Sequence, residues 1–123
     1  MISFQGFEMT PDSPIYLQII MYVKKGLASG AITAGDELPS RRVLSTLLGV
    51  NPNTVQKAYK MLEEQNLICS YPGAGSIITI DEASKSIIKT ELVEEELRHS
   101  ITSLKMLGLD KNTVLSLIDK NWE

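Results

Sequence analysis

The stretch from residue 38 to residue 75 constrains this chain more than any other part. Its sequence is LPSRRVLSTLLGVNPNTVQKAYKMLEEQNLICSYPGAG. The pattern predicts two short helices joined by a tight turn, followed by a two-stranded hairpin with glycines at its tip. Residues 38–62 also carry four basic side chains and no acidic one. A helix pair with a basic surface is typical of proteins that place one helix in a DNA groove.

Cap and turn residues set the bounds of the two helices. The earlier helix is predicted from about Ser40 to Leu48, and Gly49 provides the sharp turn. Asn51-Pro52 is a cap followed by proline, so the later helix starts there and runs to about Gln65. We expect two buried stripes, made of Val43, Leu44, Leu47 and Leu48 in the earlier helix and Val55, Ala58, Tyr59 and Leu62 in the later one.

The outward face of the later helix carries only hydrogen-bonding residues. They are Asn53, Thr54, Gln56, Lys57 and Lys60. Asparagine and glutamine can bond adenine through both amide groups, and lysine can reach guanine. Lys60 is expected to contact a phosphate of the DNA backbone. Arg41 and Arg42, which open the earlier helix, can meet the DNA backbone or a base edge. Gly73 and Gly75 leave the hairpin tip small enough to approach the sugar-phosphate backbone or enter the minor groove.

The segments around this stretch are predicted to be helix and strand. Ser13 is the expected cap of a first helix, with Pro14 at its first position and Gly30 at its end. A short extended piece, Glu37-Leu38, is expected before Pro39. The hairpin strands are predicted at 67–71 and 76–80. Further core positions expected within these elements are Tyr16, Tyr22 and a buried or half-buried Cys69.

The C-terminal part is predicted to contain two helices, from Ser84 to Leu107 and from Asp110 onward, separated by Gly108. Their apolar stripe needs a partner, because the helices are too long to cover themselves. A homodimer is the natural solution, and its two-fold symmetry would match a palindromic operator. The expected dimerisation residues are Ile88, Leu92, Val93, Leu97, Ile101, Leu104, Val114, Ile118 and Trp122.

The distribution of charge reconciles a DNA-binding function with an acidic chain. The 123 residues have a formal net charge of -3, but residues 81–123 hold nine acidic and six basic residues, while residues 38–62 are +4. A local basic patch can still hold phosphates.

With one cysteine, no signal peptide pattern and no apolar run long enough for a membrane, a cytoplasmic protein is expected. We expect no cofactor, metal site or catalytic constellation, and His99 is expected at the surface.

The sequence resembles a known family. PIYLQI, then LPS-R, LGV, NTV, AY-LE and a G-G tip occur in the order and spacing of the winged-helix domain of GntR superfamily transcription regulators, over roughly residues 14–80. The short tail resembles the YtrA-type branch. That resemblance implies a dimerisation role for the tail and regulated genes that are often transporters of the ABC class.

Three positions depart from the family pattern. Many relatives carry arginine where this chain has Pro52 and Gln56, so an arginine-led readout is not available there. Asn66 stands where many relatives have glycine, and asparagine tolerates the left-handed backbone.

The predicted fold is therefore mostly α with a small β-hairpin. A winged helix-turn-helix DNA-binding domain is expected at 1–80 and a two-helix dimerisation tail at 81–123. The predicted function is a non-enzymatic, sequence-specific transcription regulator, a repressor of a transporter operon, that binds double-stranded DNA as a homodimer. Two alternatives remain open: a winged-helix protein-interaction module without DNA binding, and a regulator with a small-molecule inducer between tail and core.

Overall fold

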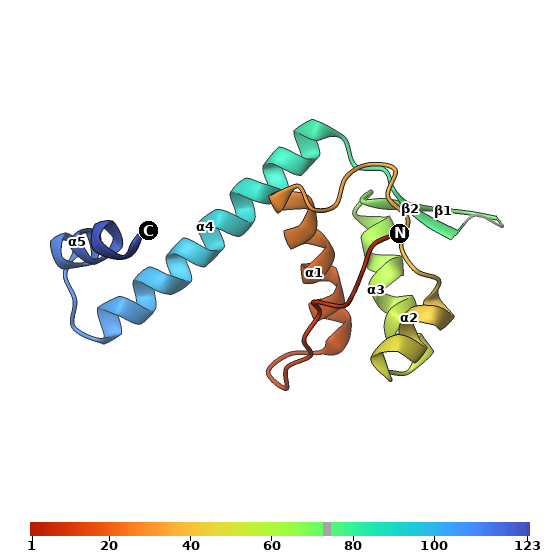
Figure 1. Cartoon of the computed structure of the whole chain (residues 1–123), viewed down its shortest axis with the longest axis horizontal. Helices are drawn as coiled ribbons and strands as arrows, with labels where there is room; N and C mark the ends of the chain where they lie inside the picture. Colours follow the sequence, from red (N-terminus) through yellow and green to blue (C-terminus); the bar gives the residue numbers. More distant parts are fainter. Residues whose placement is uncertain (73–74) are drawn as a thin grey trace. The chain divides into compact units, whose positions relative to one another are not determined.

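The computed structural model describes residues 1–72 and 75–123. Its elements are α1 (Ile15–Ser29), α2 (Arg41–Leu48), α3 (Pro52–Glu64), β1 (Ile68–Tyr71), β2 (Gly75–Ile78), α4 (Glu82–Met106) and α5 (Lys111–Asn121) (Figure 1). They confirm the predicted fold class. The chain divides into two compact units, 1–89 and 90–123, and the boundary falls within α4. No helix of the described residues is long and apolar enough to cross a membrane.

Helix α3 lies at the centre of the first unit, where it packs against α1, α2 and β1. Its predicted inward face is confirmed, since Val55, Ala58, Tyr59 and Leu62 are all buried. The other buried apolar residues of this core come from every neighbouring segment: Ile2, Phe4, Ile19, Ile20, Val23, Leu27, Ile32, Leu38, Leu44, Leu67, Ile68, Ile78 and Ile80.

The start of α1 differs from the prediction. Pro14 occupies the cap position with an extended backbone (ψ 142°), and no side chain caps the helix. Ser13 therefore lies one residue too early to be the cap. Its carbonyl instead accepts a hydrogen bond from Gln18 Nε2 at 2.7 Å. The predicted end at Gly30 is confirmed by its left-handed conformation.

The predicted buried stripe of α2 was wrong at two positions. Val43 is 54% exposed and Leu47 is 61% exposed, whereas Leu44 is fully buried and Leu48 is half-buried. Helix α2 has only eight residues, and α3 is the one helix against which it packs extensively. One neighbour covers a narrow stripe, which Leu44 and Leu48 fill at a spacing of one turn.

The hairpin is joined by a third extended segment. Strands β1 and β2 are antiparallel, with Ile68 opposite Ile78. The Leu38 N–H donates to the Ser76 carbonyl at 2.9 Å, and the Ile78 N–H donates to the Asp36 carbonyl at 2.9 Å. These bonds confirm the extended piece expected before Pro39. Asn66, between α3 and β1, has the predicted left-handed backbone (φ 61°).

Cys69 is exposed, which contradicts the expectation of a buried or half-buried residue. Side chains alternate along a strand. Ile68 points into the core, so Cys69 points to the opposite face, which is left open to solvent.

The N-terminal segment forms part of the core, which the absence of a clear sequence period did not indicate. Ile2 and Phe4 are buried, and the Ile2 N–H donates to the Glu37 carbonyl at 2.7 Å. The Phe4 ring stacks on Tyr22 with 4.7 Å between centroids, and the Tyr22 hydroxyl donates to the Ser3 carbonyl at 2.7 Å. Residues 2–4 therefore close one side of the first unit.

The second unit contains α4 from Thr90 onward and the whole of α5. Asp110 caps α5 by accepting the Thr113 N–H at 2.9 Å, and hydrogen bonds from the Thr113 side chain and backbone lower the pKa of the Asp110 carboxyl. Leu97, Ile101 and Ile118 line an apolar groove of about 520 Å³ between the two helices.

Most of the predicted dimerisation residues lie in this unit. Val93, Leu97, Ile101, Ile118 and Trp122 are exposed, while Leu92, Leu104 and Val114 are half-buried. Ile88 belongs to the first unit, where it packs against the core. His99 is exposed, as predicted.

Replacing Phe4 with alanine is expected to lower the free energy of unfolding by about 3 kcal/mol, because it leaves a cavity beside Tyr22. Urea unfolding followed by far-UV circular dichroism measures this change. Met9→Ala is the matched control, since Met9 lies in the same segment but is 46% exposed. Equal losses in the two variants would show that residues 2–4 do not belong to the core.

Candidate nucleic-acid interface

The turn between α2 and α3 fixes the first turn of α3. Gly49 adopts a left-handed backbone (φ 68°), and the Val50 N–H donates to the Ser45 carbonyl at 3.0 Å. The Asn51 side chain then accepts the Asn53 N–H at 2.8 Å, which confirms the predicted cap. The positive end of the helix dipole is thus held at a defined place on the surface.

The outward face of α3 is polar and accessible, as predicted. Asn53, Gln56, Lys57 and Lys60 are exposed, and Thr54 is half-buried. The opposite face of α3 is packed in the core, so these side chains cannot turn inward. The structure brings all five predicted residues of α3 to one surface, although it does not test their contacts with DNA.

Tyr16 of α1 borders this surface, a position that the sequence did not reveal. It was expected in the core, but it is half-buried. The Lys57 ammonium lies 4.1 Å from the centroid of the Tyr16 ring. A cation over an aromatic ring gains about 0.5–1 kcal/mol at an exposed site. Tyr16 therefore favours one orientation of Lys57 on the face of α3.

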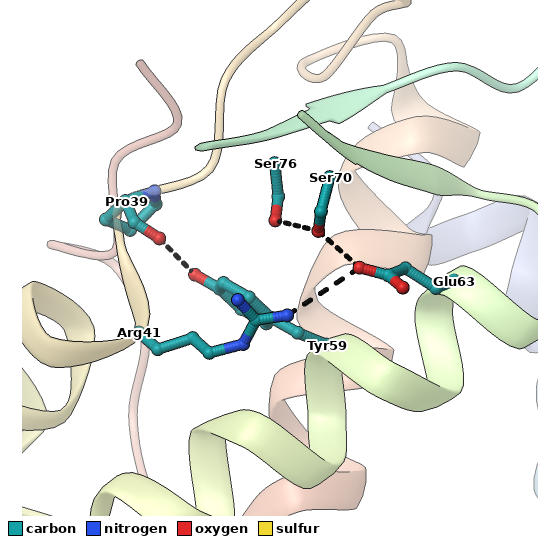
Figure 2. Close-up of polar contacts among 6 residues, drawn as sticks. All are labelled: Pro39, Arg41, Tyr59, Glu63, Ser70 and Ser76. Atoms are coloured by element: carbon teal, nitrogen blue, oxygen red, sulfur yellow. Dashed lines mark hydrogen bonds and ion pairs between the residues drawn. The ribbon is translucent and has the colours of Figure 1, made fainter. Parts of the chain in front are cut away.

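The two arginines of α2 have different surroundings. Arg42 is exposed, and no ion pair to it is found among residues 1–72 and 75–123. Arg41 is half-buried, with Nη2 at 3.6 Å from Glu63 Oε1 and its guanidinium 5.5 Å from the centre of the Tyr59 ring (Figure 2). The sequence did not indicate this pairing, because the two partners lie on different helices.

Tyr59 connects the back of α3 to the segment before α2. Its hydroxyl donates to the Pro39 carbonyl at 2.6 Å, and Pro39 precedes the cap residue Ser40 (Figure 2). Burial raises the pKa of the Tyr59 hydroxyl well above its ordinary value, and the nearby Arg41 guanidinium opposes this with a smaller effect. The hydroxyl therefore stays protonated and remains a donor at any physiological pH.

The hairpin contributes the remaining predicted site. Gly75 is exposed and has a left-handed backbone (φ 77°), whereas Gly73 lies outside the described residues. Tyr71, at the end of β1, is 49% exposed. Among the described residues, no three His, Cys, Asp or Glu side chains gather in a way that could hold a metal ion.

Comparisons with known proteins give one consistent result. The family described as "Bacterial regulatory proteins, gntR family" matches residues 15–78. The HTH-type transcriptional repressor YtrA of Bacillus subtilis is 37% identical over 101 residues, which cover 80% of this chain and 77% of the repressor. The family match spans α1, the helix pair and the hairpin.

Solved structures are also similar to this chain. A GntR family transcriptional regulator from Listeria monocytogenes has a TM-score of 0.80 and 32% identity, covering 91% of this chain and 98% of the other. The DNA-binding domain of AraR in complex with operator ORX1 has a TM-score of 0.51 and 26% identity, covering 58% of this chain and 92% of the other.

Substitution of Gly49 tests the geometry of the turn. Gly49→Ala is expected to lower the free energy of unfolding by about 1 kcal/mol, because a Cβ is disfavoured in the left-handed region. Gly49→Asn should cost clearly less, since asparagine tolerates that conformation. Thermal and urea unfolding of both variants provide the measurement, and equal losses would contradict a left-handed turn at this position.

Proposed function

Since the chain belongs to the gntR family of bacterial regulatory proteins, in its YtrA-type branch, we propose that it binds operator DNA as a homodimer and represses transcription. The observation that supports this proposal best is the polar face of α3. Four of its five residues are exposed, and its helix start is fixed by the Gly49 turn and the Asn51 cap. A helix held in this way can enter the major groove without rearrangement.

The roles that we propose follow from the chemistry of each side chain. Asn53, Thr54 and Gln56 read base edges, and the amides of Asn53 and Gln56 suit adenine. Lys57, oriented by Tyr16, reaches guanine or a phosphate. Arg42 and Lys60 bind phosphates. Arg41, predicted in the same role, pairs with Glu63 in the free chain.

The hairpin is proposed to follow the DNA beside α3. Gly73 and Gly75 would bring its tip to the minor groove, since neither residue adds a side chain that would prevent a close approach. The AraR domain, whose structure contains an operator, supports the use of this fold on duplex DNA. A role at operator DNA requires a cytoplasmic protein.

The homodimer is proposed from the apolar surface of the second unit. Leu97, Ile101 and Ile118 line a groove that water would otherwise fill, and Trp122 is 83% exposed. A second copy can cover this surface, and two copies would present two α3 helices to half-sites about 34 Å apart or a multiple of that.

Repression is supported by the likeness to the YtrA repressor, and transporter genes are proposed as targets from the YtrA-type resemblance.

Replacing Gln56 with alanine is expected to relax base preference at one position of the site by about 1–3 kcal/mol. The measurement uses duplexes that the wild-type protein selects from a randomised library, with every single-base variant of the selected site. Lys60→Ala is the contrasting variant. It should weaken binding to all sequences alike and reduce the slope of log K against log salt by about 0.9. Unchanged preference in Gln56→Ala would remove that residue from the readout.

Failure of the wild-type protein to bind any duplex at low salt would contradict the proposed function as a whole. It would instead favour the winged-helix protein-interaction module. A steep fall of affinity with rising salt is the result expected from the DNA-binding function.

A charge in the groove of the second unit should separate the subunits. Ile101→Glu is expected to yield monomers in sedimentation velocity, because it would place a carboxylate in a desolvated apolar contact. Leu47→Glu is the matched control. Leu47 is equally apolar and 61% exposed, but it lies on α2. A dimer that persists in Ile101→Glu and dissociates in Leu47→Glu would locate the interface on the first unit.

A further inference from the structure

One carboxylate oxygen connects the helix pair to the hairpin. Glu63, in the last turn of α3, uses Oε1 for two partners from different elements. It accepts a hydrogen bond from the Ser70 hydroxyl of β1, and it lies 3.6 Å from Arg41 Nη2 of α2 (Figure 2). The Ser70 hydroxyl is in turn 3.0 Å from the Ser76 hydroxyl of β2. These four residues form a chain of contacts, here called the brace, through α2, α3, β1 and β2.

The position of the brace relates it to DNA recognition. Ser70 and Ser76 are register partners in β1 and β2, so the brace contacts both strands at the same position along the hairpin. Glu63 follows Tyr59 by one turn of α3. It also comes seven residues after Gln56 and three after Lys60, so it lies at the C-terminal end of the stripe that carries these two residues. The brace therefore sets the angle between the hairpin and the helix proposed to enter the major groove, and the Glu63 carboxylate is already engaged by Ser70 and Arg41.

The surroundings of Arg41 indicate that its charge belongs to the brace. Its guanidinium lies against the Tyr59 ring, and its Nε is buried without a hydrogen-bond partner among the described residues. Glu63 is the one acidic group with which it pairs in the described part of the chain. Turning Arg41 outward to a phosphate would cost it the Glu63 ion pair and the contact with the Tyr59 ring. Arg42, the next residue, is exposed and carries no such cost.

We propose that Glu63 is a positioning residue for DNA recognition, which holds the hairpin at a fixed angle to α3 and retains Arg41 as an internal partner rather than a phosphate ligand. The inference rests on the proposed DNA-binding function and deepens it. It assigns the phosphate contact of α2 to Arg42 alone, and it makes the discrimination between sequences depend on a residue that touches no base.

The test compares affinity for a duplex selected by the wild-type protein from a randomised library with affinity for a scrambled duplex of equal length and composition. Glu63→Ala should lower the ratio of the two affinities about tenfold, because it removes a charge-assisted hydrogen bond that orients the hairpin. Glu64→Ala is the matched control, since it removes the same charge from an exposed neighbour on α3. It should leave the ratio unchanged.

Two variants of Ser70 keep the test independent of the stability of Glu63→Ala. Ser70→Ala removes the hydroxyl and should lower the ratio by a similar factor, whereas Ser70→Thr keeps the hydroxyl and should restore it. The double variant Glu63→Ala/Ser70→Ala should lose little more than either single variant, since both remove one interaction. A ratio that is equal in Glu63→Ala and Glu64→Ala, or unchanged in Ser70→Ala, would overturn the positioning role.

The salt dependence of binding tests the role of Arg41 separately. Arg42→Met should reduce the slope of log K against log salt by about 0.9, the value for one lost phosphate contact, while Arg41→Met should leave the slope unchanged. An equal reduction in both variants would show that Arg41 binds phosphate and would overturn that half of the inference. Absence of any binding by the wild-type protein would instead refute the proposed function, so the two failures are distinguishable.

Discussion

The burial of one face of α3 is the interaction on which the rest of the structure depends. Val55, Ala58 and Leu62 have no exposed surface, and Tyr59 adds a hydrogen bond to the Pro39 carbonyl. Because this face is fixed, the polar face is also fixed, with no rotational freedom about the helix axis. The same anchoring serves α2, since the Tyr59 bond reaches the residue just before its cap. A surface that recognises a pattern of bases needs this rigidity, and here it is supplied from the side opposite to the reading residues.

The sequence predicted the parts of the fold that depend on local signals. The Gly49 turn, the Asn51 cap, the left-handed Asn66 and the inward face of α3 each follow from one or two residues and a helical period. It failed where the outcome depended on neighbours. The apolar stripe of α2 is wide enough to pack against two neighbouring helices. In this fold α2 packs extensively against α3 alone, so Val43 and Leu47 remain exposed.

The candidate site shows the same division. Periodicity alone placed Asn53, Gln56, Lys57 and Lys60 on the outside of α3. The partners of those residues and of the arginines could not be read in this way. The contacts between Tyr16 and Lys57, and between Arg41 and Glu63, join residues from separate helices, and their formation depends on how the helices cross. The +4 count of residues 38–62 likewise overstates the charge available to a ligand, since Glu63 lies just outside that range and compensates one of the four.

The extended pairing of Ile2 with Glu37, and of the segment around Glu37 with β2, has a consequence for the kinetics of folding. The Ile2 N–H meets the Glu37 carbonyl, and Glu37 is bridged to Ile77 of β2. Helices α2 and α3 lie within the chain segment that this bridge closes. Their contacts are local in sequence and form early, whereas closing the bridge requires a larger loss of chain entropy. The helix pair would therefore assemble before the hairpin is docked, and the last structure to form would also be the first to open in transient unfolding of the native protein.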